Sequence, residues 1–178
     1  MPRRIALLRG INLGSRRRVA MSELRDLLTS LGYEDVRTYL HSGNVVLTSD
    51  LPDERLEREL EQQIEAKLGV DPRVVVRTRD ELADVVARDP FGEVAADTKR
   101  YQVTFLSAEP SPERVRELAD LDVAPERFVV SGREIYAWHP DGIQRSKLAA
   151  ALTDRRLGVT ATARNWNTVT KLLALADG

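Results

Sequence analysis

The chain has no cysteine and only two histidines among its 178 residues. Without cysteine, a disulfide scaffold, a thiolate nucleophile and a cysteine-based zinc site are excluded. The two histidines, His41 and His139, are far apart in the sequence, and we expect each of them to be structural. We therefore predict no metal site and no cofactor.

An excess of charge of one sign is also lacking. Lysine and arginine together number 27, aspartate and glutamate together number 28, and the net charge is −1. This balance produces no overall field that would attract nucleic acid or a membrane surface. Nucleic acid is therefore a disfavoured partner, although the scattered arginines leave nucleic-acid binding as an alternative.

Long hydrophobic runs are missing as well. The first apolar run, residues 5–8, ends at Arg9 before it reaches the length of a signal-peptide core. No other run approaches the roughly 18 apolar residues of a membrane span. We expect a cytoplasmic protein that makes no membrane contact. Hydrophobic residues still make up 42% of the chain, which is enough for a folded core and argues against intrinsic disorder.

The first half of the sequence alternates between strand and helix patterns. Apolar and β-branched segments predict strands over residues 3–9, 36–41 and 74–76, and a further strand that begins at Val45. Helical spacing predicts one helix that ends before Gly32 and a second over residues 53–68. The apolar residues of the second helix recur every four positions: Leu56, Leu60, Ile64 and Leu68. The order is βαββαβ, which is typical of a ferredoxin-like unit.

The pattern begins again after a bridging stretch. Thr78 and Glu81 have the spacing of a capping box and predict a short helix. A strand over 101–106, a helix after Ser111 and a hairpin over 128–138 follow. A helix over 146–156 comes next, then a short and weak strand segment over 160–163, and a terminal helix from Trp166. We predict an α+β fold of two ferredoxin-like (βαββαβ) halves in tandem, the second half incomplete, with a C-terminal helix.

This reading divides the chain into three parts. An N-terminal ferredoxin-like lobe covers residues 1–78, a connecting helix and linker cover 79–100, and a C-terminal ferredoxin-like lobe with its closing helix covers 101–178. Consecutive apolar residues, as in Val74–Val76, predict sheets that are buried on both faces. We therefore expect the lobes to pack against each other in a monomer.

The first candidate site lies in the N-terminal lobe. In a βαββαβ sheet, the loop after the first strand and the hairpin after the second meet at one edge. Glycine lets backbone N–H groups approach a ligand, Asn and Ser donate hydrogen bonds, and Arg binds phosphate or carboxylate in a bidentate manner. The predicted residues are Arg9, Gly10, Asn12, Gly14, Arg16, Ser42, Gly43 and Asn44. The loop lacks the spacing of the known phosphate-binding motifs. The alternative is that these residues form turns and that the arginines are solvated.

The second candidate site lies near the C-terminus, where two predicted helices begin beside cations. Helix N-termini with nearby positive charge attract anions. The predicted residues are Ser146, Lys147, Arg164, Asn165, Trp166, Asn167 and Lys171. The alternative is that Asn165 or Asn167 caps a helix and that Trp166 anchors the core. Whether the two candidate sites form one site is left open.

Four segments carry a resemblance to a known family. They are residues 7–14 (LLRGINLG), 32–47 (with VRTYLHSGNVVL), 145–148 (RSKL) and 164–172. Over essentially its whole length the chain resembles the domain-of-unknown-function family 1697. The resemblance implies a small bacterial protein with two ferredoxin-like lobes, and it implies no particular activity. Ser15 and Arg16–Arg18 stand here where the family tends to have a second glycine and lysines.

These observations favour the binding of an anionic small molecule, phosphorylated or nucleotide-like, at the Gly10–Arg18 loop and the Ser42–Asn44 hairpin. An enzyme that acts on such a ligand is an alternative, with Lys147 or Lys171 as acid–base group. That version requires a partly buried amine near the first candidate site. A nucleic-acid-binding protein is a second alternative, which the near-zero net charge and the few aromatic residues disfavour. A role in binding other proteins is also open.

Overall fold

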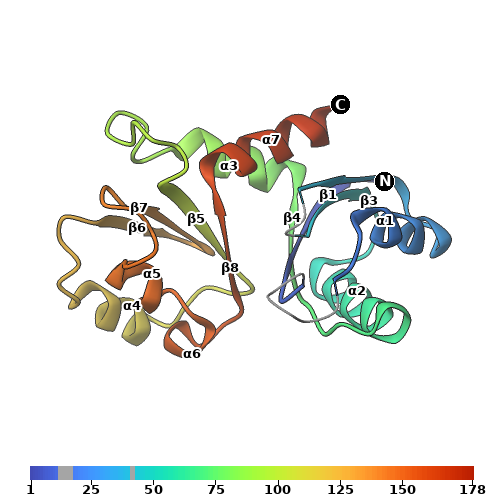
Figure 1. The fold of residues 1–178 in the computed structure, drawn as a ribbon, viewed down its shortest axis with the longest axis horizontal. Helices are drawn as coiled ribbons and strands as arrows, with labels where there is room; N and C mark the ends of the chain where they lie inside the picture. Colours follow the sequence, from blue (N-terminus) through green and yellow to red (C-terminus); the bar gives the residue numbers. More distant parts are fainter. Residues whose placement is uncertain (12–17, 41–42) are drawn as a thin grey trace. The chain divides into compact units, whose positions relative to one another are not determined.

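The computed structural model describes residues 1–11, 18–40 and 43–178 (Figure 1). Within these ranges the chain divides into two compact units. The first unit consists of Met1–Ala83 together with Lys171–Gly178, and the second consists of Asp84–Thr170. The C-terminal residues therefore belong to the same unit as the N-terminal strand.

The first unit contains a four-stranded antiparallel sheet with the order β2-β3-β1-β4. The elements along the chain are β1 (Arg3–Arg9), α1 (Met21–Ser30), β2 (Glu34–Tyr39), β3 (Asn44–Thr48), α2 (Asp53–Leu68) and β4 (Arg73–Thr78). Helix α3 (Arg79–Arg88) follows β4 directly. The order βαββαβ confirms the ferredoxin-like arrangement predicted for this half.

The helices α1 and α2 pack on one face of this sheet. The apolar stripe of α2 is buried, as its four-residue spacing predicted: Leu56, Leu60, Ile64 and Leu68. The strand residues that join the same core alternate along β1 and β4: Ala6, Leu8, Val74 and Val76. Because side chains of a strand alternate between faces, Arg9 and Arg73 lie on the face opposite α1 and α2.

The second unit repeats this topology. Its sheet has the order β6-β7-β5-β8, which corresponds strand by strand to the first sheet. The elements are β5 (Tyr101–Leu106), α4 (Pro112–Ala119), β6 (Arg127–Ser131), β7 (Glu134–Trp138), α5 (Lys147–Ala151), α6 (Asp154–Leu157), β8 (Ala161–Asn165) and α7 (Trp166–Asp177). Two tandem ferredoxin-like halves and a C-terminal helix are thus confirmed.

One detail of the predicted fold was wrong. The weak segment 160–163 indicated an incomplete second half, whereas β8 is present and pairs with β5 from Gln102 to Leu106. Alanine, which alternates with polar residues here, has little strand propensity of its own. The strand forms because β5 offers an unpaired edge in the second sheet, and local sequence does not reveal that edge.

The last strand of each half carries a buried arginine at the same position. Arg77 on β4 and Arg164 on β8 are 0% and 8% exposed. Each Nη1 donates to the carbonyl of the preceding residue, at 3.0 Å to Val76 and 2.9 Å to Ala163. Burial lowers the pKa of Arg164 to about 10. The shared arrangement supports an internal duplication of the βαββαβ unit.

The residue after each buried arginine caps the helix that follows. Thr78 Oγ1 accepts from Glu81 N at 3.1 Å, and Glu81 Oε2 accepts from Thr78 N at 2.8 Å, which is the capping box predicted from the sequence. Asn165 Oδ1 accepts from Thr168 N at 2.9 Å. Helices α3 and α7 are therefore equivalent elements of the two halves.

The outer edge of β4 is closed by two carboxylates of α2. Glu57 Oε1 accepts from Val76 N, and Glu61 Oε1 accepts from Val74 N, both at 2.9 Å. These backbone groups point away from β1 and would otherwise need water or another strand. The first sheet therefore ends at β4.

We expect Glu57→Ala and Glu57→Gln to differ in their effect on stability. Burial is the main cause that raises the pKa of Glu57, so its charge is disfavoured in the fold. The alanine variant leaves Val76 N–H without its acceptor and should lower the free energy of unfolding by about 1 kcal/mol. The glutamine variant keeps an acceptor without the charge and should equal or exceed the wild type at pH 7. Urea unfolding followed by circular dichroism distinguishes them; equal losses in both would contradict this account.

Candidate anion-binding site

The described ends of the two turns of the first candidate site lie together in the first unit. Strand β1 ends at Arg9 and β3 begins at Asn44, and these strands are antiparallel neighbours. Leu8 N donates to Gly43 O at 2.8 Å. Gly10 and Gly43 both have φ +87°. The described ends of the two turns thus lie at one rim of the sheet, which we call the β1–β3 rim (Arg9, Gly10, Gly43, Asn44).

Four of the predicted site residues are not among those that the structure describes. They are Asn12, Gly14, Arg16 and Ser42. His41, predicted to be structural, also lies outside the described ranges. The described part of the site consists of the residues that flank these positions.

Gly43 occupies a position that only glycine can fill. A Cβ atom there would lie 2.7 Å from Leu8 Cβ and 2.9 Å from Ile11 Cδ1. Its φ of +87° is also strained for residues with a side chain. The close approach holds the hairpin against the segment that follows β1.

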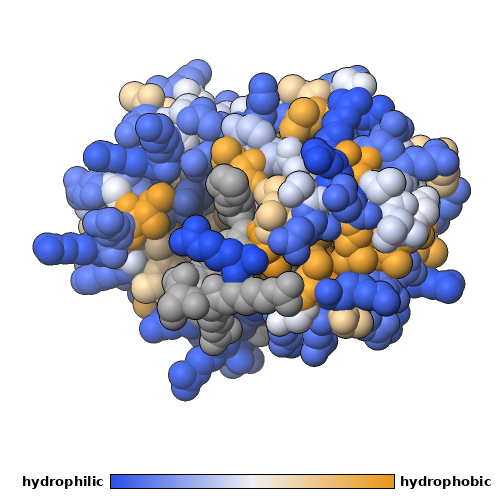
Figure 2. Space-filling model, turned by 45° about the vertical axis from the view of Figure 1, so that its right-hand side comes forward, coloured by the Kyte–Doolittle hydropathy of each residue, from blue (hydrophilic) through white to orange (hydrophobic). Residues whose placement is uncertain are grey.

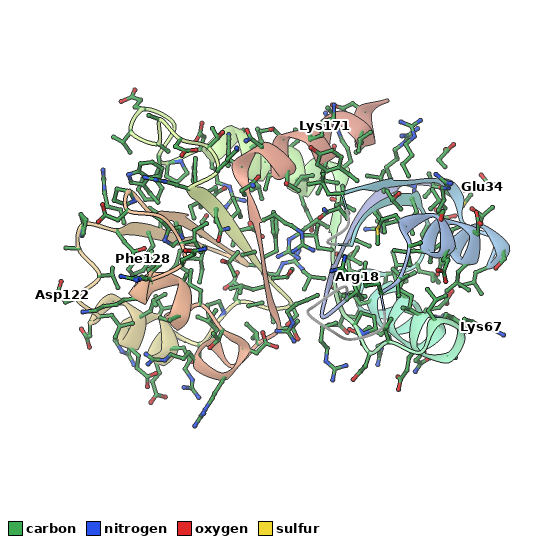
Figure 3. All side chains as sticks on the ribbon, in the orientation of Figure 1. Arg18, Glu34, Lys67, Asp122, Phe128 and Lys171 are labelled. Carbon is green, nitrogen blue, oxygen red and sulfur yellow. The ribbon has the colours of Figure 1, made fainter. Side chains whose placement is uncertain are left out.

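Positive charge gathers next to this rim. Arg9 on β1 lies directly opposite Arg73 on β4. Arg73 Nη1 is 3.7 Å from Asp71 Oδ1, and both side chains are at least half exposed, so this ion pair is weak. Arg18, in the segment that leads into α1, is exposed and adds a further positive charge to the first unit (Figure 3). Arg9 and Arg73 therefore bring two guanidinium groups to the same face of the sheet beside the rim.

Asn44 has a structural role in the hairpin. It is fully buried, and its Nδ2 donates to Tyr39 O at 2.9 Å. This is the turn-forming function that was the alternative to ligand binding. Gly10 is less tightly packed than Gly43: a Cβ atom added at Gly10 would lie 3.6 Å from Asp71 O, which is an ordinary van der Waals distance.

Ser146 of the second candidate group is part of a buried polar cluster. Its Oγ accepts from Ala149 N at 2.9 Å and thereby caps α5. The same Oγ donates to Glu126 Oε2, and His139 Nδ1 lies 2.5 Å from that oxygen. Leu148 N donates to Glu126 Oε1 at 3.3 Å. One carboxylate therefore accepts three hydrogen bonds.

This Ser–His–Glu cluster is not arranged as a catalytic triad. A catalytic histidine contacts the carboxylate with one ring nitrogen and the nucleophile with the other. Here Nδ1 of His139 approaches both Glu126 Oε2 and Ser146 Oγ, the latter at 3.1 Å. His139 Nε2 is buried and has no hydrogen-bond partner in the part of the chain that the structure describes. The cluster is structural, in agreement with the sequence expectation for His139.

The segment that begins α7 is also held by internal contacts. Trp166 stacks on Tyr101 with ring centroids 4.5 Å apart and an interplanar angle of 5°. Arg164 Nη1 donates to Thr162 Oγ1 at 2.6 Å. Asn167 Oδ1 accepts from Thr98 Oγ1 at 2.8 Å. Asn165 is the helix cap and Trp166 the anchor, as the alternative interpretation proposed.

The two lysines proposed for acid–base chemistry are exposed. Lys147 begins α5 in the second unit, and Lys171 lies on α7 in the first. Figure 3 shows Lys171 well separated from Arg18. Neither amine has the partial burial that the enzyme hypothesis requires.

Sequence reasoning did not single out Arg77 or Glu126. Arg77 directly follows the apolar run Val74–Val76, and the same pattern of an arginine followed by a helix cap recurs at Arg164, so the repeat was a detectable signal. No sequence signal marked Glu126, because a glutamate in a loop is ordinarily solvated. Only the fold brings it to Ser146 and His139.

Two further properties bear on function. No helix in the described ranges is long and apolar enough to cross a membrane. Among the described residues, no group of three or more His, Asp or Glu side chains is placed to hold a metal ion. The face drawn in Figure 2 is mostly hydrophilic, with hydrophobic residues between the hydrophilic ones.

Comparison with known proteins identifies a family and a fold. The chain is similar over 98% of its length, and of the other chain's, to the structure of the conserved bacterial protein SP0830 from Streptococcus pneumoniae. The TM-score is 0.79 and the sequence identity 24%, so the likeness shows the fold alone. No curated protein matches the sequence. The family model described as "Protein of unknown function (DUF1697)" matches residues 1–136, and the chain belongs to this family.

Proposed function

We propose that the β1–β3 rim binds a small anionic molecule that carries a phosphate group. The observation that supports this is that Gly10 and Gly43 lie at the same end of β1, beside the opposed pair Arg9 and Arg73. Gly10, which is half-buried, has no side chain that would keep a ligand from the backbone, and guanidinium groups bind phosphate oxygens in pairs.

The same sheet is poorly suited to nucleic acid. Ferredoxin-like RNA-binding modules stack bases on aromatic residues of their central strands. The corresponding positions of the central strands β1 and β3, on the face that carries Arg9, are aliphatic: Ile5, Leu7 and Val46. These residues are also buried, so they offer no stacking surface. A small molecule at the rim is therefore favoured over a polymer along the face.

Thermal unfolding with a panel of anions tests the proposal. Inorganic phosphate, pyrophosphate, nucleotides and sugar phosphates are compared with acetate and chloride at constant ionic strength. A phosphate compound at about 100 times its dissociation constant should stabilise the protein by roughly 2.7 kcal/mol. Arg9→Ala and Arg73→Ala should lose this stabilisation.

Arg25→Ala is the matched control, because Arg25 is an exposed arginine on α1 of the same unit. It should retain the stabilisation by phosphate compounds. No stabilisation by any compound, or equal stabilisation in all three variants, would overturn the proposed function.

A further inference from the structure

Three of the four outer strands in the two sheets are protected against pairing with another strand. The edge of β4 is closed by Glu57 and Glu61, as described above. On β8, Asp154 Oδ1 accepts from Ala161 N at 2.9 Å, and Arg164 donates to Ala163 O. Side chains therefore form hydrogen bonds with the outward backbone groups of β4 and β8, the last strand of each half.

The edge of β2 is protected by its irregular backbone. The register with β3 shifts between Glu34 and Arg37, and Asp35 has φ +51°. Leu40, just beyond the strand, has φ +59°. Bulges and left-handed residues of this kind prevent a second strand from adding to an edge.

Strand β6, the equivalent of β2 in the second half, has none of these features. It pairs with β7 from Arg127 to Ser131 without a register shift. The two-residue turn closes on the Ser131–Glu134 pair, so alternation directs the backbone groups of Phe128 and Val130 outward. Within the residues that the structure describes, no side chain or backbone group bonds to this outer edge of β6. Figure 3 labels Phe128 on this strand.

We propose that the free edge of β6 pairs with the β6 edge of a second copy of the chain, antiparallel and centred on Val129. Val129 is an apolar side chain that is 38% exposed. The two-fold axis places Val129 opposite Val129 of the second copy. Such a pair is the non-hydrogen-bonded kind of an antiparallel ladder, in which the two side chains lie closest together. Phe128 then faces Val130 of the copy, so both outward sets of backbone groups form hydrogen bonds.

The charges of the segment are compatible with this register. Arg127, the charged residue of β6, faces Ser131 of the copy rather than another arginine. A groove next to Arg127 is lined by residues 89, 90 and 92–94, among them the exposed Glu93 and Val94. Glu93 gives this groove a negative charge beside Arg127, so this end of β6 is not uniformly basic. Such a self-complementary edge is the isologous contact of a two-fold dimer.

Analytical ultracentrifugation over a concentration series tests the proposal. An interface of one short strand is small, so we expect monomer at about 10 µM and dimer at about 1 mM. Val129→Lys puts like charges at the centre of the contact and should weaken dimerisation at least ~10-fold. Leu40→Lys is the control, because Leu40 is a more exposed apolar residue, 52%, at the protected β2 edge. It should dimerise as the wild type does.

A second measurement locates the contact. Amide chemical shifts of Phe128 and Val130 should move with concentration in the wild type and in Leu40→Lys, but not in Val129→Lys. A monomer throughout the series, equal weakening by both substitutions, or shifts confined to other strands would overturn the proposal. The panel of phosphate compounds gives an independent result, since it concerns the first unit only.

Discussion

Replacement of Gly43 by alanine should destabilise the first unit by about 3 kcal/mol. Two costs add in this variant. The backbone at φ +87° is strained for alanine, and the new Cβ would lie 2.7 Å from Leu8 Cβ. Leu8 Cβ is attached to the central strand β1 and cannot move aside as the end of a long side chain can. The hairpin or the strand must shift instead.

Gly32→Ala separates these two costs. Gly32 lies in the same unit and has φ +95°, but a Cβ there meets nothing within 4 Å. It therefore carries the backbone strain without the collision and should cost about 1 kcal/mol. Hydrogen exchange of the β1 and β3 amides measures both variants. Equal losses would show that the contact with Leu8 and Ile11 is relieved at no cost.

Glu126→Ala should destabilise the second unit by a similar amount, about 3 kcal/mol. The substitution removes the common acceptor of Ser146 Oγ, His139 Nδ1 and Leu148 N. Two of these donors belong to buried side chains, which water cannot easily reach. Both tryptophans of the chain, Trp138 and Trp166, lie in this unit, so fluorescence during urea unfolding reports the loss.

The same glutamate should make the second unit sensitive to acid. Burial disfavours the charge of Glu126, but the hydrogen bonds from Ser146, His139 and Leu148 outweigh it and lower its pKa. Below pH 4.5, the unfolded chain binds a proton at Glu126 more readily than the folded chain does. The free energy of unfolding therefore decreases as the pH is lowered below 4.5. Well above pH 4.5, the stabilisation that these hydrogen bonds give to the ionised Glu126 is fully present.

Glu126→Gln removes this titration. The difference in unfolding free energy between the wild type and this variant should narrow as the pH falls below 4.5. Glu113→Gln, an exposed position on α4, should stay within about 0.5 kcal/mol of the wild type. A constant difference across this pH range would mean that the hydrogen bonds do not hold Glu126 in its ionised form.

The two halves of the protein show how a duplicated fold can diverge at its edges. β4 and β8 keep the same buried arginine and the same helix-capping position. β2 and β6 differ, because only β2 is bulged. A core residue is constrained by the same packing in both halves of the chain, whereas the residues of an edge strand can differ between the halves because their contacts differ.

Local periodicity was sufficient to predict most of the fold. The four-residue spacing of Leu56–Leu68, the capping box of Thr78 and Glu81, and the hairpin turn at Gly43 each express a rule that acts over a few residues. Such rules operate before tertiary contacts form. The order of elements then limits the topology to a ferredoxin-like unit.

The sequence by itself determined the element order, the predicted meeting of the Gly10 and Gly43 turns, and the exclusion of cysteine chemistry. Only the tertiary structure decided that β8 completes the second sheet, that Glu126 serves Ser146 and His139, and that the lysines stay exposed. The reason is physical: each of these depends on groups that are distant in the chain. Their energies arise from burial and pairing, which no local pattern encodes.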